Sequence, residues 1–156
     1  MLKATDLTSP LRESLEWINT FAMGAHDPWW IVFSGAAHLV GAWPATPADV
    51  DLMMSVRDAN AFANATGSLP FTGPPPSGSF RSKVFMRFEQ SPIPVEVMAD
   101  FEVHTEDGWT QGIPETCISC AGVFVPSIAD QIRIYRLLNR SKDKAIIEAL
   151  AKRLTR

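Results

Sequence analysis

Apolar residues in the first part of the chain recur at helical spacing and then gather into one short run. Ser9 and Pro10 are typical of a helix start, as an N-cap and a first helical residue, and they predict a helix over 9–24. Its apolar stripe consists of Leu11, Leu15, Ile18 and Ala22. The run over 29–33 is short and continuous, which predicts a buried strand after this amphipathic helix.

Small residues and prolines punctuate the next segment. Ser34 and Gly35 follow the apolar run and open a short helix expected over 36–40. Because Pro44 and Pro47 cannot continue a helix, the chain is expected to turn there and enter a strand over 49–55. An alanine-rich helix is predicted to follow over 57–66. A loop rich in proline and glycine, in which we expect mobility, is predicted over 73–78.

The second half of the chain begins with a period of two. Apolar and mostly charged residues alternate over 80–89, which predicts a strand with one polar face, and Ser91-Pro92 turns it into a second strand over 93–101. These two strands are expected to form a hairpin. Asp107-Gly108 marks a further turn before a strand predicted over 116–125.

The C-terminal part returns to helical spacing. Ser127 is a good N-cap for a helix over 128–138, and the residues 139–141 separate it from a helix over 142–154. Helices and strands that alternate and then give way to a hairpin predict an α+β fold, in the mixed α/β sense. With 156 residues and 46% hydrophobic content, the chain is expected to form one domain over 1–156 that these two helices close.

Charge and hydropathy narrow the choice of partners. The formal net charge of −3 gives no overall basic field, so a nucleic-acid partner would need a local basic patch. No apolar run approaches the ~20 residues that cross a bilayer, and the N-terminus has no apolar segment typical of a secretion signal. We therefore expect a soluble cytoplasmic protein that has no membrane partner.

The two cysteines are only three residues apart. Cys117 and Cys120 lack the second pair that a zinc ribbon needs, and the β-type residues around them favour a continuing strand over the helix of a thioredoxin-like motif. A free cysteine usually behaves as a small hydrophobic residue. Plain buried or half-buried thiols are the preferred interpretation, and redox or zinc chemistry is the alternative.

The acidic pair Asp49 and Asp51 is the strongest chemical signal. Residues two positions apart on a strand point to the same face, roughly 7 Å from each other. Two carboxylates placed in this way suit a shared hard cation such as Mg²⁺ or Mn²⁺. A solvent-facing strand edge that acids keep soluble is the structural alternative.

Three short segments, taken in order, resemble the nucleotidyltransferase superfamily. These are the apolar run that ends in Ser34-Gly35, the Asp49-Val50-Asp51-Leu52 segment after a gap of thirteen residues, and Val95-Glu96-Val97. The end of the chain, from Val125 to Asp143, also resembles minimal bacterial members, including abortive-infection and aminoglycoside nucleotidyltransferase-like proteins. The likeness extends from about Trp29 to Leu150.

The resemblance implies a mixed sheet with helices packed on one side, and a site where the small-residue turn meets the acidic strand. It implies that Asp49, Asp51 and Glu96 bind Mg²⁺ or Mn²⁺ and act in catalysis, with Glu96 as a third ligand or as the base. It also implies that Ser34 and Gly35 bind the phosphates of a nucleoside triphosphate. Asp100 competes with Glu96 for the third position, and Glu96 is preferred because it lies between two valines.

Basic residues are further candidates for nucleotide binding. Arg81, Lys83 and Arg87 lie on the polar face of the strand next to Glu96, where they could neutralise a triphosphate, although a solvated sheet face is the commoner explanation. The family likeness suggests that Lys142 lies near the site, and an ion pair or cap with Asp143 is equally consistent. Among the tryptophans, Trp43 and Trp109 are the candidates for stacking.

Two functions follow from these observations. The first is a metal-dependent nucleotidyltransferase that moves a nucleoside monophosphate from a nucleoside triphosphate to a hydroxyl of a small molecule, an RNA or a protein. The second is a weakly active or inactive member of the fold that binds a nucleotide or a partner protein, as antitoxin-like relatives do. A homodimer is a further possibility, because a second subunit would complete the acceptor cleft of a chain this short.

Overall fold

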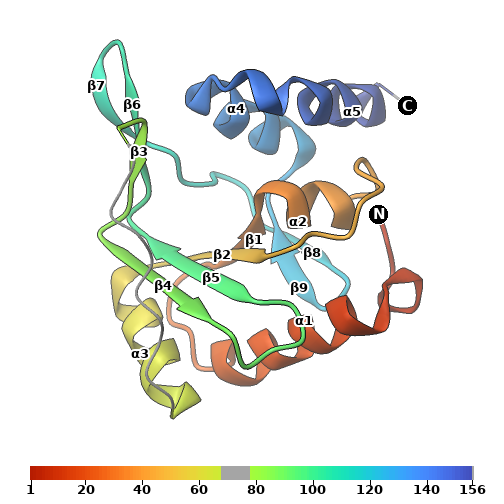
Figure 1. Ribbon diagram of the computed structural model, residues 1–156, viewed down its shortest axis with the longest axis vertical. Helices are drawn as coiled ribbons and strands as arrows, with labels where there is room; N and C mark the ends of the chain where they lie inside the picture. Colours follow the sequence, from red (N-terminus) through yellow and green to blue (C-terminus); the bar gives the residue numbers. More distant parts are fainter. Residues whose placement is uncertain (68–77, 156) are drawn as a thin grey trace.

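A computed structural model of the chain describes residues 1–67 and 78–155 (Figure 1). Its centre is a four-stranded sheet in the order β1-β2-β5-β4. These strands are β1 (Trp30–Val32), β2 (Val50–Met54), β5 (Val95–Ala99) and β4 (Val84–Phe88). Strand β2 runs parallel to β5, whereas the β1–β2 and β4–β5 pairs are antiparallel, so the sheet is mixed. The loop predicted over 73–78 lies almost entirely outside the described residues.

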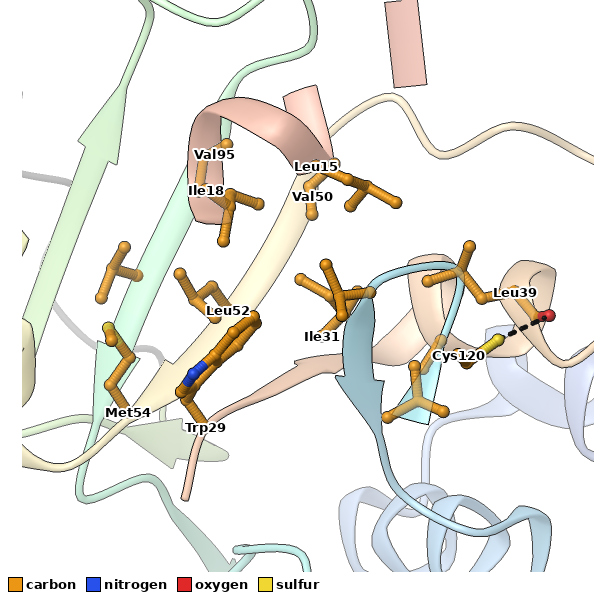
Figure 2. Packing of buried hydrophobic residues seen from close by; sticks show 14 of the residues in the cluster. Leu15, Ile18, Trp29, Ile31, Leu39, Val50, Leu52, Met54, Val95 and Cys120 are labelled. Atoms are coloured by element: carbon orange, nitrogen blue, oxygen red, sulfur yellow. Dashed lines mark hydrogen bonds between the residues drawn. The ribbon is translucent and has the colours of Figure 1, made fainter. Parts of the chain in front are cut away.

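Two helices cover one face of this sheet. They are α1 (Ser9–Ala22) and α3 (Val56–Thr66), and both lie below the sheet in Figure 1. All four residues of the apolar stripe predicted for α1 are buried, so the prediction of this helix is confirmed. Figure 2 shows how the alternate strand residues meet them, with Val50, Leu52 and Val95 pointing toward Leu15 and Ile18. Burying these side chains is the main stabilising contribution on this face.

The opposite face of the sheet packs against a second, smaller cluster. Its buried strand members are Trp30, Val32, Met53 and Met98, which alternate in sequence with residues of the first core. Leu138 of α4 (Ile128–Leu138) completes the cluster together with Phe101 and Val103. In Figure 1, α4 and α5 (Lys144–Leu154) lie on the side away from α1 and α3, with α2 (Phe33–Leu39) between them and the sheet.

The ends of the helices follow from local chemistry. Ser55 and Ser127 cap α3 and α4, because each hydroxyl accepts a hydrogen bond from the backbone N–H of an aspartate three residues later. Gly67 ends α3 and Asn139 ends α4, both in the left-handed conformation that favours glycine and asparagine. Short 3₁₀ turns lie at 4–6 and, between α4 and α5, at Ser141–Asp143.

The strand predicted over 80–89 is divided between two sheets. Strand β3 (Phe80–Arg81) pairs with β6 (Glu102–Thr105), which pairs with β7 (Gly108–Gln111), whereas β4 pairs with β5 as the predicted hairpin. The chain leaves one sheet at Ser82 and Lys83 and enters the other. A period of two cannot show such a change, because the alternation continues through it.

The single strand predicted over 116–125 is wrong. The chain forms a hairpin of β8 (Ile118–Cys120) and β9 (Val123–Val125), joined by the two residues Ala121 and Gly122. Both have positive φ, 51° and 83°, as a type I′ turn requires. Alanine rarely adopts this conformation, so the sequence lacks the usual Asn-Gly or Asp-Gly signal of a tight hairpin turn.

The cysteines belong to this hairpin. Cys117 is exposed and Cys120 is buried, and neither forms a disulfide. The Cys120 thiol donates a hydrogen bond to the carbonyl oxygen of Leu39 at 3.3 Å, drawn as the dashed line in Figure 2. Burial raises the pKa of both thiols above the ordinary value, which lowers the fraction of reactive thiolate. The expectation of a buried thiol holds for Cys120, whereas Cys117 is exposed and not buried or half-buried as expected.

The architecture is therefore the predicted α+β class, with a mixed sheet and a C-terminal helix pair. The expectation of helices on one side is wrong, because α1 and α3 cover one face of the sheet while α2, α4 and α5 lie on the other (Figure 1). Among the described residues, no helix has both the length and the apolar character needed to cross a membrane.

Candidate active site

Two carboxylates face one cavity from neighbouring strands. Asp51 of β2 and Glu96 of β5 are direct partners in the register of the parallel pair. Each lies between two buried apolar residues of the first core, so both side chains point to the opposite face of the sheet. This face forms the floor of a cavity of about 420 Å³, which α2, α4 and the turn after α4 enclose. Sequence spacing alone could not reveal that Asp51 and Glu96 are paired.

The pKa of Asp51 reflects its position beside Glu96 in this cavity. Burial raises the pKa of Asp51 well above its ordinary value, and the charge of Glu96, together with a hydrogen bond to it, raises the pKa further. The charge of Asp49 raises the pKa of Asp51 by a smaller amount, and the charge of Arg140 lowers it. A pair of carboxylates that repel each other in a partly dry cavity is a site where a cation is bound favourably.

Asp49 is connected to the pair through Arg87. The guanidinium Nη1 of Arg87 lies 2.9 Å from Oδ1 of Asp49 and 2.7 Å from Oε1 of Glu96, and its Nε lies 2.8 Å from Glu89. Hydrogen bonds to Glu89, Glu96 and Asp49 raise the pKa of Arg87 further above its already high value. The three predicted carboxylates are thus brought together, with a cationic side chain between two of them.

The fit of these residues to a divalent cation is partial. No group of three or more His, Cys, Asp or Glu side chains is arranged to hold a metal ion in residues 1–67 and 78–155. Asp51 and Glu96 offer the oxygen ligands that Mg²⁺ and Mn²⁺ prefer, and both face the cavity. Arg87 binds both Asp49 and Glu96, and Asp49 does not line the cavity, so Asp51 and, once Arg87 is displaced from it, Glu96 are the expected ligands that suit a cation there.

Solved structures show which fold surrounds this site. A Thermotoga maritima protein, TM1012, provisionally assigned as a nucleotidyltransferase, is 19% identical, with a TM-score of 0.69 over 96% of each chain. The antibiotic-resistance factor ANT(2'')-Ia is 15% identical, with a TM-score of 0.51 over 91% of this chain and 81% of that chain. The chain has a nucleotidyltransferase fold. No protein-family model and no curated protein matches the chain.

Within this nucleotidyltransferase fold, the turn after β1 has a packing role that the sequence did not reveal. Ser34 lines the cavity from the first turn of α2, as expected of a phosphate-binding residue. Gly35 is buried instead, and a Cβ atom at this position would lie 3.0 Å from Cγ2 of Ile31. The close contact of α2 with β1 therefore explains the glycine, and a contribution of Gly35 to nucleotide binding stays a prediction.

Phe33 has the strained conformation in this turn. Its φ of 57° lies in the left-handed region, which is rare for a bulky residue and often marks a functional site. The ring lines the cavity and contacts Phe101 and Tyr135, with centroid separations of 5.7 and 6.0 Å. These contacts hold the ring in place against the strain. A glycine here would be the ordinary residue for this conformation. The sequence predicted the turn at Ser34-Gly35 and placed Phe33 in the strand, so the left-handed residue lies one position earlier than expected.

We expect Phe33→Gly to be more stable than Phe33→Ala by about 1 kcal/mol, because both lose the ring but only glycine relieves the left-handed strain. Urea denaturation of the two variants measures this difference directly. If the alanine variant is equally stable, the backbone at Phe33 is not strained. Gly24→Ala, at an exposed glycine without a positive φ, is the matched control and should not lower stability.

The predicted basic residues divide into two groups. Lys142 lines the cavity and has no ion pair among the described residues, so it is available to an anionic ligand. Arg81 is 3.0 Å from Glu102 and stacks over the ring of Trp109 at 4.1 Å, and neither it nor the exposed Lys83 lines the cavity. Arg81 and Lys83 are therefore not placed with the carboxylates, because the change of sheet at 82–83 turns them away.

Several cavity residues were not predicted as site residues. Arg140 binds Asp143 through two hydrogen bonds of 2.7 and 3.2 Å, so Asp143 pairs with Arg140 and not with Lys142. Trp43, one of the two stacking candidates, also lines the cavity. Tyr135 lies in the wall, and its pKa is raised by burial and by the charges of Asp143 and Asp51. The left-handed end of α4, at Asn139, is followed by Arg140 and Asp143, which both line the cavity.

Asp100 occupies a different position from Glu96. It lies just beyond β5 with a φ of 57°, and Nε2 of Gln111 donates a hydrogen bond to its Oδ1 at 3.4 Å. It does not line the cavity that holds Asp51 and Glu96. This placement favours Glu96 as the third carboxylate, whose catalytic role stays a prediction.

Proposed function

We propose that this protein is a nucleotidyltransferase that moves a nucleoside monophosphate from a nucleoside triphosphate to a hydroxyl, with Mg²⁺ or Mn²⁺ bound by Asp51 and Glu96. The observation that carries the proposal is the in-register pair of these carboxylates on the floor of a cavity in this fold. The pKa of Asp51, raised first by burial and then by the charge of Glu96, supports it, because a bound cation would relieve both costs. In this proposal Arg87 releases Glu96 and Asp49 when the cation binds, and Asp49 is then the further ligand.

The donor would bind where cationic and hydroxyl groups meet. Ser34 on α2 and Lys142 before α5 line the same cavity as the carboxylates and suit the phosphate oxygens. Arg140 is held by Asp143 and contributes positive charge near Asp51. A bound divalent cation supplies neutralisation of the phosphate charge and orients the oxygens for in-line attack. These residues therefore define the triphosphate end of the cavity.

Glu96 is the proposed base. The acceptor hydroxyl attacks the α-phosphorus, and Glu96 takes its proton as the new oxygen–phosphorus bond forms. The bond between the α-phosphorus and the bridging oxygen breaks, and pyrophosphate leaves with the electron pair. Lys142 and Ser34 would stabilise the charge on the departing phosphates.

The ion pairs of Arg87 favour a second candidate function. A guanidinium that binds Asp49 and Glu96 at 2.9 and 2.7 Å neutralises two of the three carboxylates without any metal. If it stays there when nucleotide binds, the protein binds nucleotide or a partner protein and does not catalyse transfer. The cavity and Lys142 would serve this function equally well.

Binding of labelled ATP with MgCl₂ or with EDTA, followed by pyrophosphate release in the presence of small alcohols, RNA or protein as hydroxyl acceptors, tests both functions. We expect metal-dependent binding and pyrophosphate release in the wild type, and loss of both in the Asp49→Asn/Asp51→Asn double variant. Glu13→Gln, which removes an exposed carboxylate of α1, is the matched control. Binding without pyrophosphate release would establish the second candidate, and no metal-dependent binding would contradict the enzyme.

A further inference from the structure

The cavity has two chemically distinct ends. Its charged end contains Asp51, Glu96, Ser34, Arg140, Lys142 and Asp143. Its other end is made of the side chains of Phe80, Phe85, Met98, Phe101 and Leu138, and Ser82 is the polar residue among them. The charged end accounts for a triphosphate and its cation. The apolar end has no role in the proposed chemistry so far.

The register of the strands places the charged end and the apolar end next to each other along β5. Glu96 and Met98 are two residues apart on β5, so they share a face and lie roughly 7 Å from each other. Phe85 of β4 is the direct partner of Met98, as Arg87 is of Glu96. The apolar end therefore begins at Met98, two residues along β5 from Glu96, the proposed base.

Aromatic rings extend this surface beyond the strand. The ring of Phe101 lies 5.8 Å from that of Phe80 and 5.7 Å from that of Phe33. Phe101 and Met98 are buried and form the backing, whereas Phe80 and Phe85 are half-buried and have faces left to contact a ligand. Half-buried aromatic rings on a rigid backing are suited to stacking with another ring.

The charges around the apolar end limit what it can bind. Arg81, beside Phe80, is paired with Glu102 and stacked on Trp109 outside the cavity, and Lys83 is exposed outside it as well. No charged residue lines this end within residues 1–67 and 78–155. A polynucleotide would find no partner for its phosphates there, and a polyol or polyamine would find one hydroxyl.

We propose that the apolar end binds the ring of the acceptor, and that the acceptor is a small, uncharged aromatic alcohol or phenol. The inference rests on the proposed function, because it uses Glu96 as the group that faces the acceptor hydroxyl. With its ring between Phe85 and Phe80, such a molecule presents its hydroxyl toward Glu96, one step along β5. A cavity of about 420 Å³ is within the usual size range of sites for small molecules.

Binding of 2-naphthol to the full chain tests the inference without requiring turnover. We expect calorimetry or ligand-observed NMR to show binding in the wild type and a roughly tenfold weaker Kd in Phe85→Ala, because an aromatic contact is worth about 1.4 kcal/mol. Ser82→Asp, which adds a charge at the apolar end and removes no ring from the core, should also weaken binding. Phe124→Ala, at an exposed ring of β9, is the matched control and should bind like the wild type.

The outcomes separate this inference from the proposed function. Asp51→Asn should keep binding 2-naphthol while losing nucleotidyl transfer. If the wild type binds 2-naphthol but shows no transfer, the proposed enzyme function is contradicted and the ring-binding site is not. No binding in the wild type, or unchanged binding in both Phe85→Ala and Ser82→Asp, overturns the inference. Competition between adenosine and 2-naphthol would make this end the nucleobase site and would overturn the acceptor assignment.

Discussion

Asp51→Asn is expected to abolish nucleotidyl transfer and, at the same time, to make the metal-free protein more stable. The loss should be at least ~10²–10³-fold, because metal ligation supplies several kcal/mol of transition-state stabilisation. The gain in stability follows from removing a half-buried, poorly solvated charge that Glu96 and Asp49 repel. Thermal unfolding in EDTA should show a higher Tm, by ~2–4 °C for each kcal/mol of repulsion relieved.

The pH dependence of that gain has a definite sign. Because burial and Glu96 raise the pKa of Asp51 in the folded state, the folded chain holds its proton above the ordinary pKa of 3.8. The contribution of Asp51 to the free energy of unfolding is most favourable at low pH and is lost as pH rises from 3.8 through the folded-state pKa. The advantage of Asp51→Asn should therefore be small at pH 4 and larger at pH 7. Equal Tm values of the wild type and Asp51→Asn at pH 7 would contradict the repulsion. Glu16→Gln, at an exposed position of α1, is the control.

Asp130→Ala is expected to lower the free energy of unfolding by about 3–5 kcal/mol, the largest effect on stability that we predict. One oxygen of the buried Asp130 accepts hydrogen bonds from the backbone N–H groups of Glu115 and Thr116 and from the Thr116 hydroxyl. Its other oxygen binds Arg133 at 2.7 Å. Removing the carboxylate leaves these donors unpaired at the start of α4. Urea denaturation against Asp107→Ala, at an exposed turn, measures the difference.

The pH dependence of Asp130 should be opposite to that of Asp51. Burial raises the pKa of Asp130, but hydrogen bonds from Arg133, Thr116 and Glu115 outweigh burial, and the net pKa is lowered. Its contribution is therefore present above pH 3.8 and is lost as pH falls through the lower folded-state pKa. Acid should narrow the gap between wild type and Asp130→Ala. A gap that stays constant down to acid unfolding would show that the carboxylate charge is unimportant.

Sequence patterns predicted the elements more reliably than the pairing between them. The helices over 9–24 and 128–138 carry strong local signals, namely Pro10 at a helix start and Ser127 at a cap, and both exist close to the predicted bounds. The hairpin at Ala121-Gly122 was missed because its backbone conformation has no matching residue type at the first position. Local patterns succeed where the residue type itself favours the conformation.

The candidate site shows the same division. The acidic residues Asp51 and Glu96 could be selected from the sequence as candidates, because the family resemblance pointed to both. Their partner Arg87 could not be separated from Arg81, because both lie on the polar face of one alternating run. Only the cross-strand register, which depends on where the chain changes sheets, decides which of the two arginines meets the carboxylates.

The guanidinium of Arg87 acts as a built-in counter-ion. Its three carboxylate partners come from different parts of the sheet: the start of β2, the middle of β5 and the residue after β4. The acidic strands can therefore fold side by side before any nucleotide arrives, with part of their repulsion already neutralised. Arrival of a metal–nucleotide complex would then exchange one positive partner for another, so little ordering of the carboxylates would remain to be done at the moment of binding.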